Sequence, residues 1–173
     1  MTDLRQQIVA AARYFQAHRH QFIYTEGPQR MNFERLHGTS WPITTDCSGF
    51  VTLCYLAAGA PDPSGLGYNG QGYTGTLLGN HANQHIPLNQ VQPGDLVVYG
   101  GGTGEHTAIV VEVHGTDILT VSNGDANGPI WCWVNKPVNP PANEVTITTF
   151  DGRTPQTFLR CQTSQSRPAW NLE

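Results

Sequence analysis

The segment Cys47–Ala58, with the sequence CSGFVTLCYLAA, predicts a helix that is apolar almost all the way round. The polar residues at 44–46 (TTD) offer caps for its start, and Gly59 followed by Pro61 forms a stop signal. Such a helix has almost no face suited to water, so it is stable only when other elements cover most of it. The rest of the chain must therefore supply packing layers around this helix.

Several patterns predict those layers. Apolar residues at helical spacing predict an amphipathic helix over residues 3–18. After the turn at 93–95, the runs LVVYG, HTAIVVEV and DILTVSN predict an antiparallel meander. Residues 145–149 and 157–161, on either side of an Asp-Gly turn, predict a further hairpin. The expected fold class is α+β, with N-terminal helices packed on an antiparallel β-sheet.

Length and composition predict a single domain over residues 1–173, with its core at about 20–130 and a C-terminal hairpin and tail at about 140–173. The chain is 13% charged and holds 19 glycines and 12 prolines, which favours a compact fold with long, ordered loops. One such loop covers 61–93, and connections of this length are commonly functional. Its Tyr68 and Tyr73 are expected to form the wall of a substrate groove.

Composition also limits the partners. A net charge of −4 without a basic stripe argues against nucleic acid, and no apolar run reaches the roughly 20 residues that span a bilayer. The N-terminus lacks the pattern of a signal peptide, so we expect synthesis in the cytoplasm. We also expect a monomer. His81 and His85 in HANQH lack the Glu of a zinc-protease helix, and we expect neither a metal nor a cofactor. The four cysteines form no CxxC unit, although Cys132 and Cys161 could pair.

Cys47 at the predicted helix start has two interpretations. A thiol reacts as its thiolate, and a helix N-terminus is expected to lower the thiol pKa and to offer N–H groups for an oxyanion. Asp46 is a candidate cap, and the small Ser48 would let a substrate backbone approach the sulfur. The alternative is that Cys47 is a small buried hydrophobe.

His106 favours the first interpretation, since it opens the strand HTAIVVEV and could be brought beside the thiol. On this strand His106 should share a face with Ala108 and Val110, while Val113 points to the opposite side. At the end of the next strand, Asn123 could accept from the second imidazole nitrogen and orient the ring. Asp125 could do so if the register differs by two residues.

Three segments, in this order, resemble the NlpC-type cysteine peptidases, a papain-like group that cleaves peptide bonds in bacterial cell-wall stem peptides. TDCSGFV resembles the nucleophile motif with Cys47, VQPGDLVVYGGGTGEHTAIVVE resembles the strands that lead to the catalytic His106, and LTVSNGD places Asn123 at the third polar position. Upstream, FIYTEGPQRM resembles the segment whose tyrosine, here Tyr24, lines the site. The combined motifs are also similar to peptidase domains of endolysins from phages of actinobacteria.

The resemblance implies a peptidoglycan hydrolase that cuts a stem peptide through a Cys-His-Asn thiol mechanism, in phage lysis, acting on the wall after release or as part of a virion. The implied substrate-binding residues are Tyr24, Asp46, Ser48, Tyr68 and Tyr73. Two alternatives stay open. One is an amidase that cuts between the lactyl group of the glycan and the first alanine, and the other is a non-catalytic cell-wall-binding or virion component.

Overall fold

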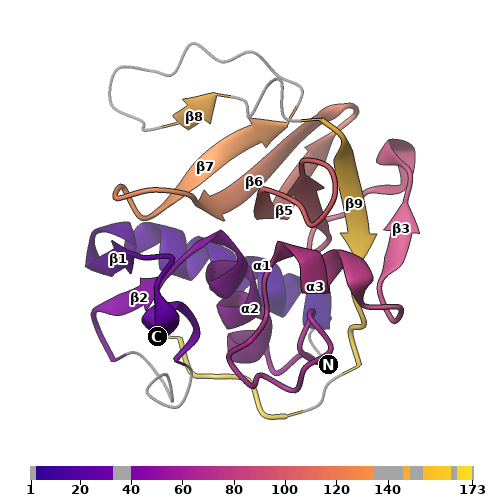
Figure 1. Cartoon of the computed structure of the whole chain (residues 1–173). Coiled ribbons are helices and arrows are strands. Elements are labelled where there is room, and N and C mark those ends of the chain that lie inside the picture. The colour runs from indigo at the N-terminus through magenta and orange to yellow at the C-terminus, as the bar shows by residue number, and fades with distance from the viewer. Residues whose placement is uncertain (1–2, 33–39, 135–145, 149–153, 165–166, 173) are drawn as a thin grey trace.

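The computed structural model describes residues 3–32, 40–134, 146–148, 154–164 and 167–172, with the backbone alone at 146–148. Two long helices, α1 (Leu4–Ala17) and α2 (Cys47–Ala58), lie side by side beneath a mixed β-sheet (Figure 1). The expected α+β architecture of helices packed on a largely antiparallel sheet is therefore confirmed.

Both predicted helices are confirmed with their caps. α1 begins where the Asp3 carboxylate accepts a hydrogen bond from the Arg5 N–H, and its buried residues are the five at helical spacing (Leu4, Ile8, Ala11, Ala12 and Phe15). In α2 every residue from Ser48 to Ala58 is buried, as its composition requires. α2 ends at Gly59, which has the left-handed conformation with φ of 77° that glycine adopts without strain.

The predicted meander forms the centre of the sheet. Strands β4 (Leu96–Tyr99), β5 (His106–His114) and β6 (Asp117–Asn123) pair antiparallel in chain order. The described strands of this sheet follow the order β3-β9-β4-β5-β6-β7-β8, with β7 at Pro129–Val134 and β3 at Gln84–Ile86. The meander thus has strands added on both edges.

The predicted C-terminal hairpin is wrong. β8 (Thr146–Thr148) pairs in parallel with β7, whereas β9 (Gln156–Arg160) lies between β3 and β4, at the other edge of the meander (Figure 1). Burial explains the placement of β9, because its Leu159 enters the core under the sheet and Arg160 forms an ion pair with the fully buried Asp95. The predicted Asp-Gly turn lies outside the described residues.

The two faces of the sheet belong to two apolar clusters. Ile109 and Val111 of β5 pack with α1 and α2, while Ala108 and Val110 belong to a second cluster on the other face. Val113, predicted to lie with Ile109, packs on the second cluster instead. The reason is a register shift between Val110 and Glu112, because one extra residue reverses the alternation of side chains beyond it.

Short elements carry the chain past the start of α2. Strands β1 (Phe22–Tyr24) and β2 (Ile43–Thr45) form a parallel pair, and β2 leads directly into α2. The other short helices are η1 (Arg19–Gln21), η2 (Pro28–Met31), α3 (Thr74–Gly79) and η4 (Leu88–Gln90). α3 was not expected, and it lies within the long Gly-rich loop.

All four cysteines are free thiols, so Cys132 and Cys161 do not pair. Among the described residues, no helix combines the length and apolar character that crossing a bilayer requires.

Candidate active site

Cys47 occupies the first position of α2, and its neighbours are fixed by the cap. The Asp46 carboxylate accepts hydrogen bonds from the Gly49 N–H at 2.7 Å and from the Ser48 hydroxyl at 3.1 Å. Cys47 is partly exposed, whereas Cys54 and the remaining cysteines are buried. The sequence therefore folds so that one thiol reaches the surface at the helix start.

The electrostatic surroundings of Cys47 differ from the expectation. Burial raises the pKa of its thiol to about 11, and the negative charge of Asp46 adds to the rise. Backbone hydrogen bonds from Thr107, Ser48 and Cys47 itself lower the pKa, but they do not outweigh the burial. The expected low thiol pKa is thus wrong for the protein without substrate, and a base must take the proton before the sulfur can attack. The contact with Thr107 also places the sulfur beside the start of β5.

His106 lies at that start and is buried, with 4% of its surface exposed. Its Nε2 is 2.7 Å from the hydroxyl oxygen of Ser122 on the neighbouring strand β6, and its ring stacks near Tyr99 with centroids 6.0 Å apart. Ser122 therefore contacts one ring nitrogen of the imidazole, as an orienting residue would. This contact was predicted for Asn123.

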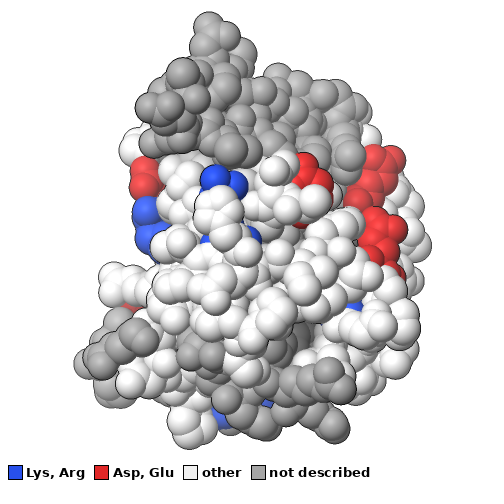
Figure 2. All heavy atoms as spheres, turned by 90° about the vertical axis from the view of Figure 1, so that its left-hand side faces the viewer, with Lys and Arg blue, Asp and Glu red and all other residues white. Residues whose placement is uncertain are grey.

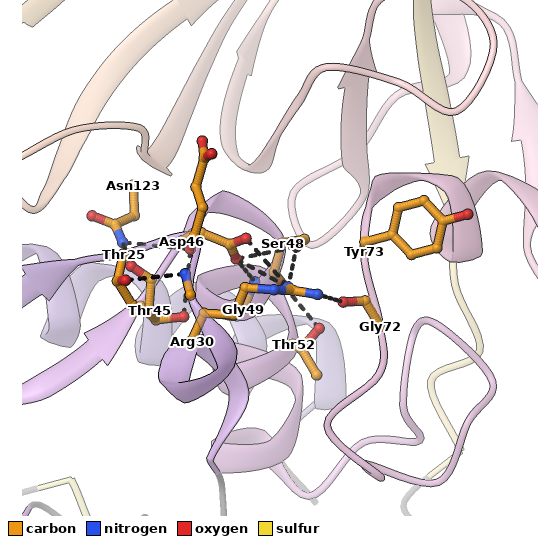
Figure 3. Close-up of polar contacts among 12 residues, drawn as sticks. Thr25, Arg30, Thr45, Asp46, Ser48, Gly49, Thr52, Gly72, Tyr73 and Asn123 are labelled. Carbon is orange, nitrogen blue, oxygen red and sulfur yellow. Dashed lines mark hydrogen bonds and ion pairs between the residues drawn. The ribbon is translucent and has the colours of Figure 1, made fainter.

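Asn123 points toward the segment that precedes Cys47 (Figure 3). It is fully buried, and its side-chain amide donates to the carbonyls of Thr45 at 3.2 Å and Asp46 at 3.4 Å. Its Oδ1 accepts no hydrogen bond in the described part of the chain. Asn123 thus ties β6 to the junction that precedes Cys47 rather than to the imidazole. The alternative residue, Asp125, accepts from the Asn127 N–H in a local turn.

Arg30, in a loop expected to bring it and Tyr24 to a specific place, is a central polar residue of the site, but its partners were not predicted from the sequence. Its guanidinium lies 3.2 Å from the Asp46 carboxylate, donates to the Ser48 hydroxyl at 3.1 Å and donates to the Gly72 carbonyl at 2.6 Å (Figure 3). It therefore joins η2, the start of α2 and the loop before α3. A buried carboxylate at a helix cap calls for a cation, but spacing does not indicate which one.

A hollow of about 480 Å³ brings the predicted residues together. Cys47 and His106 line it with the two predicted neighbours of the thiol, Asp46 and Ser48, and with Arg30. Its other lining residues are Tyr24, Glu26, Tyr73, Thr74, Glu105 and Gly124. The thiol and the imidazole therefore open onto one cavity with charged walls.

The predicted tyrosines divide between two places. Tyr24 and Tyr73 line the hollow, and Tyr24 donates to the Glu26 carboxylate at 2.9 Å. Burial and that bond to Glu26 raise the pKa of Tyr24, so the phenol keeps its proton. Tyr68 does not line the hollow, because its hydroxyl donates to the Ala60 carbonyl and its ring packs under the guanidinium of Arg167. Asp62 causes this placement by accepting the Tyr68 N–H and folding the loop back.

The described ranges contain no group of three or more His, Cys, Asp or Glu side chains suited to hold a metal ion. His85 lies in strand β3 and His81 in the loop before it, and neither lines the hollow.

A partly exposed thiol at the start of a buried helix, packed under a largely antiparallel sheet in which one strand begins with a histidine, defines a papain-like α+β protein. The family model of the NlpC/P60 family matches residues 35–131, which is more than half of the chain. The protein belongs to the NlpC/P60 family. Members of this family are usually cysteine peptidases that act on peptidoglycan.

Comparison with solved structures found three matching chains. One is the crystal structure of the P60 domain from an M. avium subspecies paratuberculosis antigen, with 21% sequence identity and a TM-score of 0.48. The alignment covers 92% of this chain and 98% of that one. No curated protein matches the sequence.

Proposed function

We propose that the protein is a cysteine endopeptidase that hydrolyses a peptide bond in the stem peptides of bacterial peptidoglycan. The observation that carries the proposal is the shared hollow of Cys47 and His106, one at a helix start and the other at a strand start. Family membership supports the substrate class. Hydrolysis of this kind needs no cofactor.

In the proposed reaction, His106 takes the proton of Cys47 as the sulfur attacks the scissile carbonyl, and a carbon–sulfur bond forms. His106 then gives this proton to the leaving nitrogen as the carbon–nitrogen bond breaks. Water then attacks the thioester carbonyl while His106 accepts one of its protons, and a carbon–oxygen bond forms. The carbon–sulfur bond breaks, the carboxylic acid product leaves, and His106 returns the proton to the sulfur. Because the thiol pKa is raised to about 11, transfer to His106 is an essential part of the first step. The backbone N–H groups of Cys47 and Ser48, which point at the sulfur, are suited to stabilise the oxyanion.

The walls of the hollow suit a charged peptide. Glu26 and Glu105 are exposed carboxylates on its rim, and Arg30 supplies a positive charge lower down. Tyr24 and Tyr73 add aromatic surface on two sides. Ser122 serves as the positioning residue for His106, replacing Asn123 in that role.

Replacement of Cys47 by Ala tests the proposal. The variant is expected to release no soluble fragments from purified cell walls while keeping the circular dichroism spectrum and melting temperature of the parent. Thr116→Ala, in the exposed turn between β5 and β6, is a matched surface control and should keep full activity. Cell-wall hydrolysis by the Cys47→Ala protein would refute the assignment of the nucleophile.

Mass spectrometry of the released fragments separates the endopeptidase from the alternative amidase. New amino termini within the stem peptide support the proposal, whereas release of intact stem peptides from the lactyl group indicates the amidase. Binding to walls without any release would indicate a non-catalytic component.

We further propose a role in phage lysis. Adding the protein to actinobacterial cells from outside and following the turbidity of the suspension tests this role.

A further inference from the structure

A second cavity lies next to the hollow of Cys47 and shares Tyr24 with it. It has a volume of about 470 Å³ and is formed by β1, η2 and the approach to β2. Tyr24 lines both cavities, so a ligand bound at Cys47 and one bound here would be separated by a single side chain. Figure 2 shows the side of the molecule on which β1 and β2 lie in Figure 1; acidic side chains gather along its right-hand edge, and much of the remaining described surface is uncharged.

The chemistry of this second cavity differs from that of the hollow. None of its described lining residues is charged; the polar ones include Thr25, Gln29, Asn32 and Thr44. Amide and hydroxyl groups both donate and accept hydrogen bonds. The hollow of Cys47, by contrast, has three carboxylates and a guanidinium on its walls. The second cavity therefore suits a ligand rich in hydroxyl and amide groups.

Trp41 gives the second cavity a rigid aromatic wall. Its indole stacks on the His18 ring with centroids 5.4 Å apart and an interplanar angle of 19°, and meets Phe22 edge-on at 5.5 Å and Phe15 at 6.3 Å. These contacts fix the ring before any ligand arrives, so little side-chain entropy is lost on binding. An aromatic wall beside amides and hydroxyls suits a sugar ring, which has apolar C–H faces and a rim of polar groups.

We propose that this cavity binds a neutral sugar of the glycan strand that carries the stem peptide, so that the preferred substrate is a peptide still attached to its sugar. The inference rests on the proposed function. The lactyl carboxylate of the sugar is consumed in the amide bond to an attached peptide, which leaves that sugar uncharged. The shared Tyr24 lets one substrate occupy both cavities.

Paired substrates test the inference in two measurements. The first compares hydrolysis of one stem peptide with and without its disaccharide, using the parent protein and Gln29→Ala/Asn32→Ala, a change of two exposed side chains in the cavity. Losing two hydrogen bonds should lower kcat/KM about tenfold for the sugar-bearing substrate and leave that for the free peptide unchanged. Gln92→Ala, an exposed amide outside both cavities, is the control.

Equal kcat/KM for both substrates with the parent protein, or an equal loss on both in the double variant, would overturn the inference. If neither substrate is hydrolysed, the proposed function fails, and the second measurement decides the inference alone. In it, a neutral N-acetylated disaccharide without a lactyl group is titrated into the Cys47→Ala protein while the indole N–H signal of Trp41, assigned with Trp41→Phe, is followed by NMR. A saturable shift that the double variant abolishes supports the cavity as a sugar site, and the absence of any shift refutes it.

Discussion

Replacing Arg30 by Met removes the charged group that joins three segments around Cys47, while the methionine keeps most of the apolar stem. Three contacts disappear: the ion pair to the Asp46 carboxylate at 3.2 Å, and the hydrogen bonds to the Ser48 hydroxyl and the Gly72 carbonyl. The Arg30 and Asp46 side chains are 18% and 12% exposed, so water replaces these contacts only in part.

Removing one partner of a buried ion pair costs about 3–5 kcal/mol, and an exposed pair contributes about 0–1 kcal/mol. Because both side chains retain some contact with water, we expect an intermediate loss of about 3 kcal/mol in the free energy of unfolding. For a domain of this size each kcal/mol lowers Tm by roughly 2–4 °C, so Tm should fall by roughly 6–12 °C. Thermal and urea unfolding measure both quantities.

A double-mutant cycle with Asp46→Asn makes the test specific to this pair. Asparagine can still accept the Gly49 N–H as a helix cap, so the change mainly removes the charge. The double variant should be more stable than the sum of the two single losses predicts, with a coupling of about 1–3 kcal/mol. Arg13→Met breaks the exposed pair with Glu112 and should cost about 1 kcal/mol or less. A loss of this small size for Arg30→Met, or the absence of coupling, would refute the reasoning.

Three further predictions concern the thiol, the imidazole and the end of α2. In His106→Ala, alkylation of Cys47 by iodoacetamide should speed up with rising pH to a midpoint near 11, because only the thiolate reacts and burial raises the thiol pKa; a midpoint below 8 would contradict this. Ser122→Ala should lower kcat roughly tenfold with a shifted pH profile and little change in KM, since it frees the imidazole, and an unaltered profile would exclude a positioning role. Gly59→Ala should cost about 2 kcal/mol or more in thermal unfolding, because φ is 77° and the new Cβ would meet the Arg167 carbonyl; an unchanged Tm would count against it.

The sequence predicted the elements whose signals are local. The limits of α2 follow from a capping aspartate and a left-handed glycine, and those of α1 from Asp3 and the helical spacing of its apolar residues. The meander follows from short turns between runs rich in β-branched residues. Cys47 at a helix start and His106 at a strand start were predictable for the same reason.

Contacts between segments far apart in the sequence could not be predicted in this way. β9 inserts between β3 and β4 because Leu159 and Arg160 find their partners there, and nothing in the segment itself distinguishes this from a hairpin with β8. Arg30 meets the Gly72 carbonyl across 42 residues, and no local pattern announces that contact. Tyr68 was placed on the wrong side because the turn around Asp62 reverses the loop.

The partner of His106 was mispredicted by one residue, and the β-bulge on β5 explains why. If the pairing of β5 with β6 ran without a bulge from the pair His114–Asp117, His106 would lie opposite Asp125. Asn123 would then share the face of the sheet on which His106 lies. The extra residue between Val110 and Glu112 shifts the register, so that Ile109 pairs with Val121. Each side chain of β6 beyond this point then faces the opposite way relative to β5.

As a result Ser122 lies on the face of His106, and Asn123 turns toward the carbonyls before Cys47. The bulge therefore sends two consecutive polar side chains to opposite faces of β6. The Ser122 hydroxyl contacts the imidazole, and the Asn123 amide anchors the segment that carries the thiol. An unbulged strand would leave Asn123 as the partner of the imidazole and the Thr45 and Asp46 carbonyls without their buried donor. The same inserted residue thus sets both the orientation of His106 and the anchoring of the helix start.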